Sequence, residues 1–411
     1  MFIYRVLTFF FIFFLPLISI YRIFKKKETL RSINQKLANY NKIPKKNLIW
    51  FHGSSVGEVL SIIPLVQELE KKRKIGQILI TSNTLSSAKV LENFKFKKTV
   101  HQYYPLDANF IVKKFLNYWK PNLCVFIESE IWPNMIQNVK KKKLPLILLN
   151  ARITQKTYKK WKKLNLFSRK LFSMFDLCLP QNKETYRYLN NLGSRNLKLI
   201  GNLKLCEMKS RSSEKFSSSE LKFFKSKKIT LTGYSTHKSE ENFCAEIFKT
   251  LRKNKNEVLI LIPRHVERAD SIVADLATKN LVVHKHSLKK IINKQTDIYL
   301  VDTYGEAKKF LGLSKVIFTG GSIIPHGGQN PLDAVRNNSI VIHGPHVKNF
   351  TEIYNFLNKE KISFKFNNMS QAIKLIKNKN KINTNTKIKL NRISNKILIR
   401  TIAELLRHVQ K

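Results

Sequence analysis

Short apolar runs alternate with segments of helical periodicity along most of the chain, and this alternation restricts the possible folds more than any other feature. In the first half the runs are Leu48–His52, Ile78–Ser82, Leu123–Glu128 and Pro145–Asn150. Helix-like stretches separate them. Strands separated by helices of this length predict βαβ units and a parallel sheet.

The same pattern starts again in the second half, after a polar segment. Residues 207–220 are rich in serine and charge, which is typical of a linker. Beyond it lie apolar runs at Ile229–Gly233, Val258–Pro263, Leu281–His284, Ile298–Asp302, Val316–Gly320 and Ile340–His343. The chain therefore predicts two doubly wound α/β domains, residues 28–206 and 221–411. We expect them to face a cleft and to bind ligands at the carboxyl ends of their strands.

An apolar segment near the start of the chain, Val6–Tyr21, is followed by a basic cluster that includes Lys25, Lys26 and Lys27. A helix of that length extends about 24 Å, less than the ~30 Å hydrocarbon core of a bilayer. We expect residues 1–27 to form a hydrophobic anchor, either a short span or an interfacial helix, with the rest of the protein on the cytoplasmic side. A cleaved signal peptide fits less well, because most of the charge follows the apolar run.

The net charge of +49 comes from 76 Lys and Arg residues against 27 Asp and Glu residues. Such an excess is compatible with a nucleic acid or an anionic membrane as partner. The lysines are spread along the whole chain, so we expect mostly solvated surface, an anionic membrane as the next explanation, and no nucleic acid. Four cysteines lie far apart without CxxC spacing, which argues against a zinc module and a disulfide framework.

Two motifs follow strands of the first half. In HGSSVGEV, Glu58 lies at a strand-to-helix turn, where a carboxylate either begins a helix or serves catalysis. In FIESEIWPN, Glu128 and Glu130 end a buried strand, and alternation points them to the same side unless the chain bends. Carboxylates are costly to bury without a role, although a salt bridge to a nearby lysine remains the simpler reading.

Two further motifs follow strands of the second half. Arg264, in LIPRHVER, suits phosphate binding or a salt bridge at the start of a helix. The glycine-rich run from Thr319 to Ala334 can cradle phosphate with backbone N–H groups. His343 and His346 lack a suitably spaced carboxylate or cysteine, so we expect no metal site there.

A series of segments in one unbroken order, among them HGSSVGEV, FIESEIWPN, GNLKL, LIPRHVER, HGGQNPLDA and HGPHVKNF, resembles the Kdo transferases. These enzymes transfer 3-deoxy-D-manno-oct-2-ulosonic acid (Kdo) from CMP-Kdo to a lipid A precursor. The resemblance extends from the apolar N-terminus to about residue 355. It implies a GT-B fold of two Rossmann-like domains with an N-terminal membrane anchor, placed at the cytoplasmic face of the inner membrane.

The resemblance also implies roles for individual residues. Glu58 falls on the proposed general base, and Glu128 and Lys204 fall on residues assigned to transition-state stabilisation. CMP would be bound by residues that follow strands of the second domain: Pro263, Arg264, Tyr304, Gly305, Glu306, Asn330, Pro331, Leu332 and Asp333. The family commonly has Met, His and Glu where this chain has Tyr304, Gln329 and Asp333. No metal or cofactor is implied.

The implied reaction is an inverting displacement, with CMP-Kdo as donor and lipid IVA as acceptor. Two alternatives remain. One is a GT-B transferase that uses another donor, such as a UDP-sugar, which competition by CMP against UDP would separate. The other is a basic membrane-attached binding protein without turnover, which predicts strongly salt-dependent binding of nucleic acid and indifference to Glu58→Gln.

Overall fold

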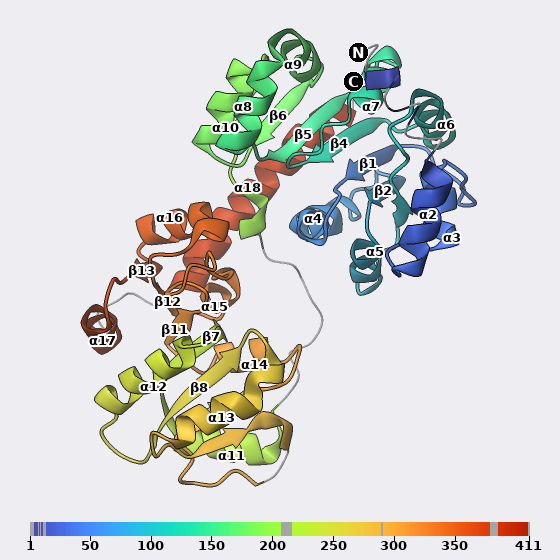
Figure 1. Cartoon of the computed structure of the whole chain (residues 1–411). Helices are drawn as coiled ribbons and strands as arrows, with labels where there is room; N and C mark the ends of the chain where they lie inside the picture. Colours follow the sequence, from blue (N-terminus) through green and yellow to red (C-terminus); the bar gives the residue numbers. More distant parts are fainter. Residues whose placement is uncertain are drawn as a thin grey trace. The chain divides into compact units, whose positions relative to one another are not determined.

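The computed structural model describes residues 4–6, 8, 10, 14–206, 216–288, 291–378 and 385–409. The chain divides into two compact units, residues 1–210 with 393–411 and residues 211–392. Each unit is built on one sheet whose strand pairs are all parallel (Figure 1). This agrees with the predicted pair of doubly wound α/β domains.

The first unit has a six-stranded sheet with the order β3-β2-β1-β4-β5-β6. Its strands are β1 (Leu48–His52), β2 (Gln77–Ser82), β3 (Thr99–Tyr103), β4 (Leu123–Ile127), β5 (Leu146–Ala151) and β6 (Leu177–Pro180). Its helices are α2 (Leu15–Phe24), α3 (Leu30–Lys36), α4 (Val56–Leu69), α5 (Leu85–Glu92), α6 (Asn109–Trp119), α7 (Pro133–Lys141), α8 (Gln155–Lys163), α9 (Asn165–Phe172), α10 (Lys183–Asn191) and the 3-10 turn η1 (Leu203–Leu205).

The second unit has a seven-stranded sheet with the order β13-β12-β11-β7-β8-β10-β9. Its strands are β7 (Lys228–Thr236), β8 (Glu257–Pro263), β9 (Val283–Lys285), β10 (Ile298–Leu300), β11 (Val316–Thr319), β12 (Ile340–His343) and β13 (Ser363–Lys365). Its helices are α11 (Ser218–Ser226), α12 (Glu240–Leu251), α13 (Ala269–Ala277), α14 (Ala307–Leu311), α15 (Leu332–Arg336), α16 (Thr351–Lys359) and α17 (Met369–Lys377), with short 3-10 turns η2 (Val266–Arg268), η3 (His286–Leu288) and η4 (Lys348–Phe350).

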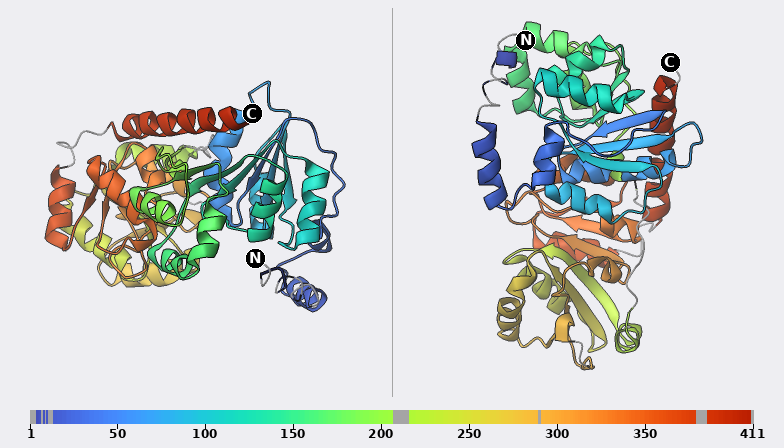
Figure 2. Two further views of the ribbon diagram at one scale, coloured as in Figure 1. Left: turned by 90° about the horizontal axis from the view of Figure 1, so that it is seen from above. Right: turned by 90° about the vertical axis from the view of Figure 1, so that its right-hand side faces the viewer.

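The central strands are buried on both faces, which explains their continuous apolar runs. Every residue of β1 is buried. On one face, Trp50 and Phe126 belong to the same core as Phe115 of α6 and Met135 of α7. Helices lie against both faces of each sheet (Figures 1 and 2).

The predicted strands are present, but three strands were not predicted. These are β3, β6 and β13, and all three lie at a sheet edge. Edge strands can do without a continuous apolar run, although β6 (LCLP) has one and is buried throughout. β3 (TVHQY) is largely polar, and β13 has only three residues.

The last helix corrects the predicted boundary of the second domain. Helix α18 (Thr386–Val409) is one long helix (Figure 2), and its residues from 393 onward belong to the first unit. There Glu404 pairs with Lys198 at 2.8 Å, and the Ile397 side chain packs against Gly201. Assigning all of 221–411 to the second domain was therefore wrong for this segment. Of the predicted linker, residues 207–215 lie outside the described residues and 218–220 begin α11.

The predicted anchor is described only in part, because residues 1–3, 7, 9 and 11–13 are not among the described residues. Across the described ranges, no helix is both long and apolar enough to span a bilayer. Helix α2 nevertheless exposes large apolar side chains, with Leu17 at 69% and Phe24 at 81%. Closer to the N-terminus, the Tyr4 hydroxyl donates to Asp107 at 2.9 Å.

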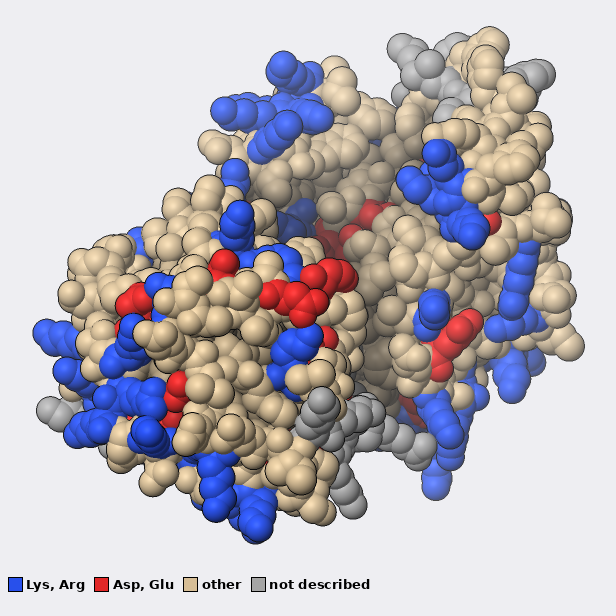
Figure 3. Space-filling view, turned by 60° about the horizontal axis from the view of Figure 1, so that its bottom comes forward, with Lys and Arg blue, Asp and Glu red and all other residues tan. Residues whose placement is uncertain are grey.

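Basic side chains are scattered over the face that Figure 3 shows. In Figure 3 the Lys and Arg side chains of the visible face lie in separate groups and do not merge into one continuous stripe. On this face the distribution is that of a solvated basic surface.

Candidate functional site

The strand orders identify one binding edge in each unit. In the first sheet the chain runs from β1 out to β3 and then returns to β4 on the other side of β1. In the second it runs from β7 toward β9 and then returns to β11 on the other side of β7. Open α/β sheets bind ligands at the carboxyl ends of strands at such reversals. The predicted site residues lie in loops at or near these two places.

Glu58 lies in the first turn of α4, directly after β1. Its carboxylate accepts from the backbone N–H groups of Ser54 at 2.6 Å and Ser55 at 3.4 Å, while the Ser55 hydroxyl accepts from the Glu58 N–H at 3.3 Å. This reciprocal capping box satisfies N–H groups that the helix leaves free. The expected helix-start role is thus present. Burial, and then the nearby carboxylate of Glu130, raise the pKa of Glu58, so the group is also a stronger base than an ordinary glutamate.

The turn that carries Glu58 depends on a glycine. A Cβ added at Gly53 would lie 3.1 Å from both the Glu58 Cβ and the Ile127 side chain. Only a residue without a side chain leaves both neighbours in place, so Gly53 allows the turn to approach the end of β4.

Glu128 and Lys204 form an ion pair of 2.6 Å. Glu128 follows β4 and is only 5% exposed, while Lys204 belongs to η1, which contacts α4. The structure therefore brings the three predicted catalytic residues into one neighbourhood. The predicted salt bridge to a lysine exists, and its lysine is itself a predicted site residue.

The chain bends at Glu128, whose φ is +54°. A left-handed conformation costs a non-glycine residue about 1–3 kcal/mol, and such strain often occurs at functional sites. Because of this bend, Glu128 and Glu130 have different partners. The same-side placement was expected only if the chain does not bend there, and the bend at Glu128 means that this condition is not met.

Glu130 belongs to a buried network that motif reading did not include. Its Oε2 accepts from Trp132 Nε1 at 2.7 Å and lies 3.0 Å from His52 Nε2. The other ring nitrogen of His52 lies 3.0 Å from the Thr81 hydroxyl, and the ring stacks on Tyr104. His52 could have been identified from the sequence, because it is a polar residue at the end of an otherwise apolar strand.

The residues predicted to bind CMP follow β8, β10 and β11. Arg264 is exposed and, among the described residues, forms no ion pair, so the salt-bridge alternative has no support. Tyr304 is 67% exposed and donates to Glu267, which follows Arg264 closely in the chain. Asp333 lies 3.9 Å from Lys308 of α14. The three predicted segments thus lie close to one another.

Glu306 and Asn330, two more of the predicted CMP ligands, also have partners within the unit. The Glu306 carboxylate lies 2.7 Å from His286 Nε2. The Asn330 side chain accepts from the backbone N–H of Leu332 at 3.1 Å, and this contact orders the start of α15.

The glycine-rich loop does not offer phosphate the N–H groups that we expected. Glu240, only 1% exposed, accepts from the backbone N–H groups of Gly321 (2.7 Å), Ser322 (3.1 Å) and Ile323 (3.1 Å). It also accepts from the N–H of His237 at 3.0 Å. For these residues the expected phosphate cradle was wrong, because a buried carboxylate of the same unit occupies their N–H groups.

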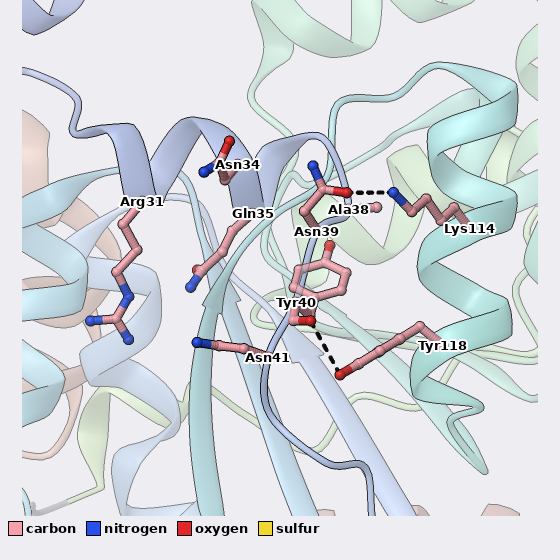
Figure 4. A pocket seen from close by; sticks show the side chains of 9 residues that line it. All are labelled: Arg31, Asn34, Gln35, Ala38, Asn39, Tyr40, Asn41, Lys114 and Tyr118. Atoms are coloured by element: carbon pink, nitrogen blue, oxygen red, sulfur yellow. Dashed lines mark hydrogen bonds between the residues drawn. The ribbon is translucent and has the colours of Figure 1, made fainter.

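A separate pocket of about 590 Å³ lies in the first unit, between α3, the loop after it and α6. Figure 4 shows Arg31, Tyr40 and Lys114 at its wall, with Lys114 donating to Asn39. None of the predicted catalytic residues lines it. Within the described part of the chain, no group of His, Cys, Asp and Glu side chains is arranged to hold a metal ion.

Comparison with known proteins gives consistent matches. Residues 31–206 match the family model described as 3-deoxy-D-manno-octulosonic-acid transferase (kdotransferase). A 3-deoxy-D-manno-octulosonic acid transferase from Rickettsia bellii is 34% identical over 80% of this chain and 78% of its own length. One from Haemophilus influenzae is 30% identical over 75% of this chain and 73% of its own.

A solved structure of HepE from Anabaena, in complex with UDP and glucose, covers 88% of this chain and 99% of its own. It has a TM-score of 0.53 and 12% identity. At that identity the likeness concerns the fold alone.

Proposed function

We propose, because this chain belongs to the 3-deoxy-D-manno-octulosonic acid (Kdo) transferase family, that it transfers Kdo from CMP-Kdo to lipid IVA with Glu58 as general base. The chain is a glycosyltransferase of lipopolysaccharide biosynthesis. The observation that carries the mechanism is the grouping of Glu58 with the Glu128–Lys204 pair at the strand reversal of the first sheet.

Glu58 would accept the proton of the attacking hydroxyl group. A sugar hydroxyl is a poor nucleophile at neutral pH, and a carboxylate within hydrogen-bond reach removes its proton as the new bond forms. The raised pKa of Glu58 improves this proton transfer. The contacts from Ser54 and Ser55 fix the carboxylate in place.

Glu128 and Lys204 would stabilise the charges that develop during transfer. As the bond from the anomeric carbon to the phosphate oxygen breaks, its electron pair leaves with CMP and the carbon becomes positive. A buried carboxylate favours that positive charge, and the ammonium group favours the negative charge on the phosphate. Their 2.6 Å contact keeps both groups oriented before the substrates bind.

The second unit would bind the CMP moiety. Arg264 supplies an exposed guanidinium for the phosphate, and Pro263 fixes the end of β8 just before it. Residues 304–306 and 330–333 follow β10 and β11 of the same sheet, and the Asp333 carboxylate would have to turn from Lys308 and Arg336 to accept from the ribose hydroxyl groups.

Membrane attachment is the remaining part of the proposal. The exposed apolar side chains of α2 suit the interface of the inner membrane at its cytoplasmic face. The net charge of +49 adds attraction to anionic lipids, at about 1 kcal/mol for each Lys or Arg close to the surface.

The decisive test is incubation of the purified protein with lipid IVA and CMP-Kdo, followed by mass spectrometry of the lipid. We expect a mass increase of one or more Kdo residues. Inhibition by CMP but not by UDP would support the cytidine donor. Absence of transfer together with binding of UDP would instead indicate another sugar donor.

A further inference from the structure

We propose that His237, His265 and His326 form, beside Arg264, a subsite that binds the carboxylate of the donor sugar acid. This inference rests on the proposed function, because it names a second anion of the same donor. His265 and His326 lie within the motifs LIPRHVER and HGGQNPLDA, and the geometry of the second unit groups them with His237.

The three imidazole rings lie together. The rings of His237 and His326 stack with centroids 4.5 Å apart, and His265 lies 5.8 Å from His237. His237 is 8% exposed, whereas His265 and His326 are exposed. The Gln329 amide lies 3.1 Å from His237 Nε2 and fixes the inner ring. The cluster therefore has a rigid base and an accessible rim.

The cluster lies at the strand reversal of the second sheet. His237 follows β7, Arg264 and His265 follow β8, and His326 belongs to the loop after β11. These three strands are neighbours in the order β11-β7-β8. The carboxyl ends of strands at a reversal are where such sheets bind ligands.

The local charge favours an anion. The nearest carboxylates have other partners, since Glu240 accepts four backbone N–H groups and Glu241 pairs with Arg268 at 3.0 Å. Among the described residues, neither Arg264 nor any histidine of the cluster forms an ion pair. Burial, and then the electrostatic influence of His326, His265, Arg268 and Arg264, together lower the pKa of His237 to about 4.

The chemistry of a 2-ulosonic acid selects the carboxylate as the ligand. In its CMP ester the anomeric carbon bears both the carboxylate and the phosphate oxygen, so the two anions are adjacent. Arg264 and the histidines are adjacent in the same way. Arg264 can therefore bind the phosphate while the imidazoles bind the carboxylate, a group that a neutral sugar lacks.

The test compares CMP with CMP-Kdo by calorimetry on the full chain, without acceptor. The wild type should bind CMP-Kdo more tightly than CMP. His326→Gln and His237→Gln should each lower that preference at least about tenfold, the scale of one charge-assisted hydrogen bond. CMP affinity should stay within about threefold. His346→Gln, an exposed histidine outside the cluster, is the matched control and should keep the preference.

Proton uptake gives a second readout that a purely structural role would not change. An anion beside His237 raises the pKa of the ring, so the complex holds more protons than the free protein. Titrations near pH 6 in two buffers of different ionisation enthalpy should show greater proton uptake for CMP-Kdo than for CMP. His237→Gln should remove the difference.

The outcomes are distinguishable. An equal loss of CMP and CMP-Kdo affinity would assign the histidines to the phosphate and overturn the carboxylate subsite. Unchanged affinity for both ligands in folded variants would also overturn it. If the wild type binds UDP rather than CMP-Kdo, the proposed donor is wrong, whatever the variants do.

Discussion

The substitution Glu58→Gln separates the two roles that the structure allows for this residue. Glutamine serves as well as glutamate at the third position of a capping box. Its carbonyl oxygen can still accept from the Ser54 N–H, so the start of α4 should persist. The amide cannot take a proton, however, and general-base catalysis should be lost. One substitution thus keeps the structural contact and removes the chemical one.

The expected magnitudes follow from these contacts. General-base catalysis contributes about 10²–10⁴ in rate, so the transfer rate of Glu58→Gln should fall by that factor. The free energy of unfolding should change by about 0.5 kcal/mol or less, the usual limit for substitutions that leave packing intact. Glu58→Ala should lose the same activity and also about 1 kcal/mol of stability, because it removes the cap.

The assay is single-turnover transfer of Kdo to lipid IVA, with urea unfolding and CMP titration in parallel. CMP affinity should be unchanged, since the proposed CMP residues lie in the other unit. Glu68→Gln, the same change later in α4, removes the surface ion pair with Lys71; it is the matched control and should keep the wild-type transfer rate. Transfer by Glu58→Gln within threefold of the wild-type rate would refute the base assignment and leave the capping role alone.

The pH profile provides an independent check. A general base must be ionised, so kcat/KM should fall as the pH drops through the pKa of Glu58. Burial and Glu130 place that pKa above the value of about 4.3 for an unperturbed glutamate. The acidic limb should therefore lie above that value and should be absent from the residual activity of Glu58→Gln.

Three further perturbations follow from the structure. Arg264→Ala should weaken CMP binding by about 1.5–3 kcal/mol in calorimetry, and unchanged affinity would exclude a phosphate contact. Lys204→Met should abolish transfer and lower the free energy of unfolding by about 1–3 kcal/mol. This loss is smaller than for a fully buried ion pair, because Lys204 is partly exposed. An unchanged urea midpoint would show that its pair with Glu128 does not stabilise the fold. Deleting residues 1–27 should keep CMP binding, release only part of the protein from vesicles and make the remaining attachment more sensitive to salt, whereas complete loss of CMP binding would show that this segment stabilises the fold.

The central strands could be predicted because burial on both faces imposes an uninterrupted apolar run. Leu48–His52 matches β1 residue for residue, and Ile340–His343 matches β12. The edge strands β3 and β13 escaped prediction because one of their sides has no neighbouring strand to cover. The position of the last helix could not be predicted either, because an amphipathic pattern does not indicate which sheet the helix packs against.

The candidate site was likewise predictable only in part. Glu58, Glu128 and Lys204 were found through their motifs, and the structure groups them. Contacts between residues far apart in the sequence were not predicted. Glu240 accepts N–H groups about eighty residues away, and His237 stacks on a ring of the loop after β11. The spacing of residues along the sequence does not indicate which distant segments come into contact.

The division of α18 between the two units has a consequence for biosynthesis. Residues 393–409 are translated after the whole of the second unit, yet they complete the first. On the ribosome the second unit can finish folding while the first still waits for its last helix. The Lys198 side chain and the surface around Gly201 stay uncovered during that interval, so a translational pause late in the message would expose the first unit, and not the second, to proteases and chaperones.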